Sequence, residues 1–91
     1  MIKSFKCRKT ESLFDGQFVA AFSGFKRQAE KRLRILDAAD TLEVLAALPS
    51  NRFESLAGNR NGQYSIRINQ QWRVCFIWDA GAYQVEIIDY H

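Results

Sequence analysis

The last third of the chain alternates apolar and polar residues with a period of two, which restricts it to a β-sheet with one face on a core. The alternation predicts three strands, over Gln63–Asn69, Trp72–Trp78 and Tyr83–Tyr90. The middle run has apolar residues on both faces, which favours a central strand. A turn over residues 79–82 joins it to the last strand.

The same period fixes the register of the first hairpin. The apolar residues of Gln63–Asn69 and Trp72–Trp78 share a face only if an odd number of residues joins the two strands. A three-residue loop, 69–71, sets Arg67 opposite Arg73 on the face away from the main core, and parity brings Tyr90 onto that face. Like charges in opposition cost a few tenths of a kcal/mol or more. We therefore expect the arginine pair to be well solvated, or to have an anion between its members.

The rest of the chain reads as one short strand followed by helices. Residues 1–7 fit a strand, and Thr10 can cap a short helix that ends near Asp15-Gly16. A second helix is predicted over Ser23–Asp40, where apolar residues recur at steps of three and four. Its apolar face is Phe25, Ala29, Leu33, Leu36 and Ala39. With the strands, these helices predict an α+β fold.

Basic side chains gather around the remaining surface of the helix over 23–40. They are Lys26, Arg27, Lys31, Arg32 and Arg34. Such a run is either a solvated helix face or an electrostatic contact for a phosphate backbone or an acidic partner.

An irregular segment follows this helix. Thr41–Leu48 fits a short helical turn that Pro49 ends, and Ser50–Gly62 is a loop rich in Asn, Arg and Gly. In so small a domain, a loop of this length is either functional or mobile.

Length and composition predict a single domain, residues 1–91, without metal or membrane. The net charge of +3 slightly favours a polyanionic partner. Cys7 and Cys75 belong to no CxxC pair and the only histidine is the last residue, so we expect reduced thiols and no zinc site. No long apolar stretch or signal peptide is evident, and we expect a cytoplasmic protein.

The end of the predicted sheet carries groups that can cut RNA without a metal. The reaction needs a base for the 2′-hydroxyl, an acid for the leaving 5′-oxygen and cations for the charged phosphorane. Arg73 and Arg67 are candidate cations, and His91 can serve as acid or base. Tyr90 can stack on a base or donate a hydrogen bond, and Asp89 can orient His91, act as a base or simply cap the strand.

Each of these residues also has an ordinary structural explanation. A terminal histidine is often frayed, a strand tyrosine often packs, and an arginine on a sheet face is often only soluble surface. The convergence of Arg67, Arg73 and Tyr90 on one face, with His91 directly after, favours a site.

Three stretches, residues 51–69, 71–76 and 85–91, resemble the HigB-type toxins of the RelE/ParE superfamily, and residues 1–6 fit as well. The combination of Gly-Gln-aromatic-Ser-Ile-Arg, Trp-Arg and a terminal Asp-Tyr-His is specific, and the resemblance covers essentially the whole chain. It implies two N-terminal helices packed on a twisted, mainly antiparallel sheet of about four strands. It also implies a type II toxin that cuts mRNA in the ribosomal A site without a cofactor, with a HigA-type helix-turn-helix antitoxin as partner.

The resemblance also assigns residues. The family's catalytic set matches Asp89, Tyr90, His91 and Arg73. In the RNA-binding role we expect Arg67, Arg60, Lys31 and Arg34. Two positions depart from the better-known members: Glu54 stands for a histidine and Ala57 for a lysine. Glu54 can act as a base or position His91, whereas the cation missing at position 57 predicts a milder nuclease.

Two other functions stay open. A non-enzymatic poison of the same fold, such as the ParE branch that inhibits DNA gyrase, has no evident need for the terminal His91. A plain RNA- or protein-binding module would use the same residues only to grip its ligand.

Overall fold

Four strands form one antiparallel sheet in which each strand lies beside the next along the chain. The computed structural model describes residues 1–89, so Tyr90 and His91 lie outside the described residues. The strands are β1 Glu54–Ser55, β2 Tyr64–Arg67, β3 Trp72–Trp78 and β4 Ala82–Asp89. β3 lies between two partners, as its apolar residues on both faces predict.

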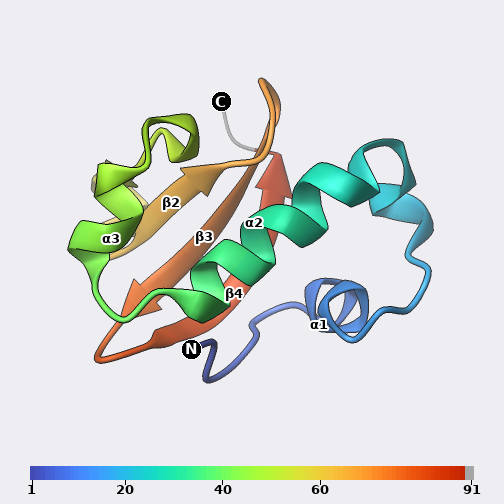
Figure 1. The fold of residues 1–91 in the computed structure, drawn as a ribbon, viewed down its shortest axis with the longest axis horizontal. Coiled ribbons are helices and arrows are strands. Elements are labelled where there is room, and N and C mark those ends of the chain that lie inside the picture. The colour runs from blue at the N-terminus through green and yellow to red at the C-terminus, as the bar shows by residue number, and fades with distance from the viewer. Residues whose placement is uncertain (90–91) are drawn as a thin grey trace.

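The helices precede the sheet and cover one of its faces. In Figure 1 the long helix α2 lies across the sheet, with α1 and α3 at its two sides. The α-helices are α1 Arg8–Phe14, α2 Lys26–Ala38 and α3 Leu42–Ala47. Short 3-10 turns are η1 Ala20–Phe25, η2 Pro49–Asn51 and η3 Gly58–Arg60. The predicted α+β class and antiparallel sheet are thus confirmed.

The main core lies between α2 and the sheet. Ala29, Leu33 and Leu36 on α2 are completely buried. They belong to one cluster with sheet residues at alternate positions, Ile66, Ile68, Val74, Phe76, Val85 and Ile87. Burial of this apolar surface drives helix and sheet together and fixes which face of each strand points inward.

The first hairpin has the predicted register. Ile66 pairs with Val74 and Arg67 with Arg73, and the Ile68 amide donates to the Trp72 carbonyl at 2.9 Å. The loop is residues 69–71, where the Asn69 side chain accepts two backbone amides. The odd loop keeps the apolar residues of both strands on the core face.

Two expectations for the N-terminus were wrong. Residues 1–7 form no regular strand; they pair with β4 through two isolated parallel bridges, Ile2 to Ala82 and Phe5 to Val85. Thr10 does not cap α1, whose N-cap position is Cys7. The Thr10 hydroxyl is buried and accepts the Ile87 amide at 3.0 Å. The hydroxyl thus gives a hydrogen-bond acceptor to a backbone amide at the free edge of β4. This amide follows the β4 residues that pair with the N-terminal segment.

The helical region and the loop also differ from expectation. α2 begins at Lys26, because the residues before it form the 3-10 turn η1. The short helical turn expected over Thr41–Leu48 is confirmed as α3, which Thr41 caps, its hydroxyl accepting the Val44 amide at 3.3 Å. The segment over 50–62 is not wholly irregular: its two-residue strand β1 pairs with β2, Glu54 opposite Ser65. So short a strand carries no alternation by which a sequence can reveal it.

Candidate active site

The sheet face opposite α2 carries the charged residues that sequence parity brought together. Side chains alternate across a strand, so Arg73 points away from its buried neighbour Val74. The ladder register puts Glu54, Ser65, Cys75 and Glu86 in one row across all four strands. The adjacent row on the same face is Arg67, Arg73 and Ile88.

Arg73 is largely buried on this face, with 7% of its surface exposed. Its Nε donates to the Ser65 hydroxyl at 2.7 Å, and its Nη2 donates to the Arg52 carbonyl. Its Nη1 lies 3.4 Å from a carboxylate oxygen of Glu54, whose side chain is 53% exposed. Two corners of the guanidinium are therefore held by neutral acceptors, and the third meets an anion open to solvent.

This arrangement decides how the fold accommodates two opposed arginines. Arg73 is not well solvated, contrary to one of the two expectations. Its anion belongs to the chain itself, because Glu54 reaches it from the edge strand. Arg67 turns its Nε to the Asn69 carbonyl at 3.0 Å, in the hairpin loop. Arg67 and Arg73, although opposite each other in the ladder, therefore bind different acceptors.

A second ion-pair group holds the loop over 56–62 to the same face. Arg60 Nη1 donates to Gln63 Oε1 at 3.0 Å and to Glu86 Oε2 at 3.2 Å. Lys6 Nζ approaches the same Glu86 oxygen at 3.6 Å. Arg60, expected as an RNA contact, thus ties its loop to β4.

Cys75 lies on the same sheet face, near four charged side chains: Glu54, Arg60, Arg73 and Glu86. Burial raises the pKa of the Cys75 thiol to about 11, with Glu86 and Glu54 adding to the rise and Arg60 and Arg73 opposing it. The thiol is therefore neutral at physiological pH and is a poor nucleophile.

Asp89 ends β4 beside the first hairpin. It pairs with Trp72 in the ladder, and its Oδ2 accepts the Gln71 side-chain amide at 2.9 Å. By alternation its side chain leaves the strand on the face opposite to that of Arg73. The expected positions of Tyr90, diagonal to Arg73, and of His91 lie outside the described residues.

Comparison with known proteins places this geometry in a family. Residues 4–91 match the family described as the RelE-like toxin of the type II toxin–antitoxin system HigB. The chain belongs to this HigB-like toxin family. The resemblance to HigB-type toxins, which the sequence indicated over essentially the whole chain, is thereby confirmed.

Two relatives show the extent of the likeness. Toxin HigB-1 of Vibrio cholerae is 44% identical over 61 residues, which is 67% of this chain and 64% of that protein. The chain thus spans just under two thirds of the Vibrio toxin. Endoribonuclease HigB of Proteus vulgaris is 34% identical over 95 residues that span both chains completely.

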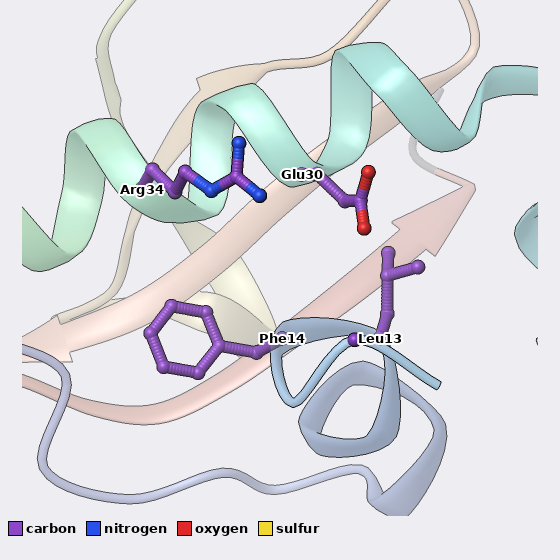
Figure 2. A pocket seen from close by; sticks show the side chains of 5 residues that line it. Leu13, Phe14, Glu30 and Arg34 are labelled. Atoms are coloured by element: carbon purple, nitrogen blue, oxygen red, sulfur yellow. The ribbon is translucent and has the colours of Figure 1, made fainter. Parts of the chain in front are cut away.

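The two basic residues expected on the helix layer are not near Arg73. Lys31 and Arg34 are exposed on α2, which covers the other face of the sheet. Figure 2 shows Arg34 and Glu30 projecting from α2 toward Phe14 and Leu13 of α1, with which they line a small pocket. The sheet separates this HigB-like toxin's basic helix from its candidate active site.

Arg32 is the functional candidate that the sequence reading missed. It was placed with the surface cations of its helix, but it is buried, with 9% of its surface exposed. Its Nη1 donates to Asn51 Oδ1 at 2.8 Å and to Ser50 Oγ at 3.3 Å. The helical spacing could have indicated this burial, because position 32 follows Ala29 by three residues and precedes Leu36 by four, which places it on the same helix face.

Neither a metal centre nor a membrane span is found in the part of the chain that the structure describes. Residues 1–89 contain no group of three or more His, Cys, Asp or Glu side chains that could hold a metal ion. No helix among them is long and apolar enough to cross a bilayer.

Proposed function

We propose that this toxin is an endoribonuclease that cuts mRNA on the translating ribosome, in the cytoplasm, without a metal or other cofactor. Its family membership and the name of the Proteus vulgaris relative support the activity. The observation that carries the proposal is the anion site at Arg73, where one corner of a nearly buried guanidinium faces a carboxylate open to solvent.

The anion site suits a phosphodiester. A carboxylate and a phosphate present similar charged oxygens to a guanidinium. Glu54 Oε1 therefore marks where a phosphate oxygen of RNA would bind once the glutamate side chain moves aside. Because Ser65 and the Arg52 carbonyl fix the other corners, Arg73 needs no reorganisation to stabilise charge on the phosphorane.

We assign the proton transfers to the other candidate residues of the site. Glu54 takes the 2′-hydroxyl proton or positions His91 to take it. The 2′-oxygen attacks phosphorus, the bond to the 5′-oxygen breaks, and an acid, for which His91 is the candidate, protonates that oxygen. Tyr90 stacks on a base or donates to the phosphate, and Asp89 orients His91 or acts as a base.

RNA contacts divide between the two layers. Arg67 and Arg60 lie on the Arg73 face and are proposed to contact the substrate backbone. Lys31 and Arg34 lie on α2 and can contact only a surface that reaches the helix layer, such as ribosomal RNA. A HigA-type helix-turn-helix antitoxin would neutralise the toxin by covering the basic helix or the edge of the site.

The test is cleavage of a defined mRNA by the purified chain, with and without translating ribosomes. We expect cleavage only with ribosomes, and its loss in Arg73→Ala and His91→Gln. Full cleavage by both variants would remove the catalytic assignment. RNA binding without cleavage would indicate a binding module, and double-strand DNA breaks without mRNA fragments in cells would indicate a gyrase poison.

A further inference from the structure

The segment over 50–54 is held from two layers of the fold. On the helix side, Arg32 donates from Nη1 to the side chains of Ser50 and Asn51. On the sheet side, Arg73 binds the carbonyl of Arg52 and the carboxylate of Glu54. The residue bound by one arginine is therefore the direct neighbour of the residue bound by the other.

The turn between these two contacts has a constrained backbone. Arg52 adopts a left-handed conformation with φ of 46°, which non-glycine residues rarely take. Asn51 is completely buried, and its Nδ2 donates to the Leu45 carbonyl at 3.0 Å, at the end of α3. An unfavourable backbone conformation of this kind persists only where its surroundings hold it.

Arg32 is buried without a counter-ion. The ion pairs found within residues 1–89 involve other cations, and both acceptors of Arg32 are neutral. Burial accordingly lowers the pKa of Arg32 from its ordinary value. A buried charge without an opposite charge is costly, so space-filling alone does not account for a guanidinium here. What it provides is one nitrogen that binds two successive residues of the turn.

We propose that Arg32 is a positioning residue for Arg73: it fixes the turn over 50–52 so that the Arg52 carbonyl and Glu54 meet the Arg73 guanidinium. The inference deepens the proposed function and rests on it only for the cleavage readout. Arg32 touches neither the anion site nor the substrate. It acts through the segment over 50–54, across the layer boundary from α2 to β3.

Removal of the Arg32 guanidinium should release the turn over 50–52 and displace the Arg52 carbonyl and Glu54 from Arg73. Arg32→Met keeps the apolar stem and removes the donors to Ser50 and Asn51. We expect single-turnover cleavage to fall about 10- to 100-fold, as small misplacements of catalytic groups do. Leu36→Val, one turn along the same helix, is the matched control and should cleave at the wild-type rate at temperatures well below its melting point.

A double-mutant cycle separates positioning from general loss of structure. In Arg73→Lys, a single ammonium group replaces the guanidinium and cannot bind Ser65 and the Arg52 carbonyl together. In this background we expect Arg32→Met to change the cleavage rate by less than about 2-fold. An equal loss in both backgrounds, or a loss in Leu36→Val of the same size, would overturn the inference.

A spectroscopic readout is independent of cleavage. The Arg73 Nε proton, which is hydrogen-bonded to the Ser65 hydroxyl, should exchange slowly with solvent in the wild type and in Leu36→Val. We expect exchange about 10-fold faster in Arg32→Met. Unchanged exchange would refute the positioning role even if the chain cut no RNA, whereas faster exchange in an inactive wild type would leave only the proposed function wrong. If Arg32→Met fails to fold, Arg32→Lys and Ser50→Ala take its place with the same expected direction.

Discussion

Arg32 and Arg73 are both nearly buried arginines that hold the same short segment, yet their surroundings differ in one respect. Arg32 faces two neutral acceptors, the amide oxygen of the buried Asn51 and the hydroxyl of the exposed residue Ser50. Arg73 has two neutral acceptors and a half-exposed carboxylate. Only Arg73 therefore offers a corner at which an incoming anion can replace an existing one.

This difference separates a structural contact from a binding site. A guanidinium whose partners are all neutral groups of the chain can only hold what it touches, at the energetic cost of burying a charge. A guanidinium with an exposed anionic partner is preorganised for a second anion of similar geometry. By this criterion we expect Arg73 to bind substrate and Arg32 to support the segment that orients it.

The largest effect should come from Arg73 itself. Arg73→Ala removes the guanidinium that we propose to bind the phosphate, and we expect ribosome-dependent cleavage to fall by at least about 10²-fold. Arg67→Ala, in the same row, should lose less activity, because Arg67 Nε is bound to the Asn69 carbonyl and Arg67 is proposed only to contact the substrate backbone. Similar losses in the two variants, measured as single-turnover rates, would mean that the two arginines share the role.

A gain of function should follow from a cation at position 57. Ala57 is exposed in the loop beside η3, at the position where the resemblance leads us to expect a lysine. We expect Ala57→Lys to raise mRNA cleavage and growth inhibition, by up to about 10²-fold. Ala57→Gln is the uncharged control. Unchanged or weaker toxicity of the lysine variant would remove the explanation for a mild nuclease.

The structural role of Arg32 should appear in stability. Arg32→Met leaves the buried Asn51 amide oxygen without its donor. We expect the free energy of unfolding to fall by about 1–3 kcal/mol, the cost of an unsatisfied buried acceptor. Urea denaturation measures this directly, and Arg34→Met on the exposed side of α2 should show no comparable loss. Wild-type stability of Arg32→Met would contradict the buried network.

The smallest effect concerns the exposed partner of Arg73. Glu54→Gln keeps the side-chain shape and removes the competing charge, so the concentration of mRNA-loaded ribosomes at half-maximal rate should fall about 2- to 5-fold. A simultaneous drop in the maximal rate would assign Glu54 as the base. A half-saturation that is unchanged or higher would show that Glu54 does not occupy the phosphate position.

The sequence predicted the sheet face but not the contacts that complete it. Strand parity placed Arg67 opposite Arg73 because alternation is a local property, and helical spacing found the α2 core for the same reason. Glu54 could be named as a candidate, yet its contact with Arg73 depends on a two-residue strand without a periodic pattern.

Polar residues on buried faces were the main errors. Arg32 and Thr10 were assigned to a surface and a cap from residue type alone, whereas long-range partners bury both. Apolar periodicity cannot find such residues, because their burial depends on acceptors or donors supplied by distant segments. Position on a helical face, taken without regard to polarity, would have included Arg32.

Mapping of mRNA 5′ ends in cells tests most directly the claim that the Arg73 anion site cuts RNA. Wild-type toxin and Arg73→Ala are induced without antitoxin at equal protein levels. We expect new 5′ ends within translated reading frames for the wild type and their loss in the variant. The same set of new ends with Arg73→Ala, or none with the wild type despite growth arrest, would contradict it.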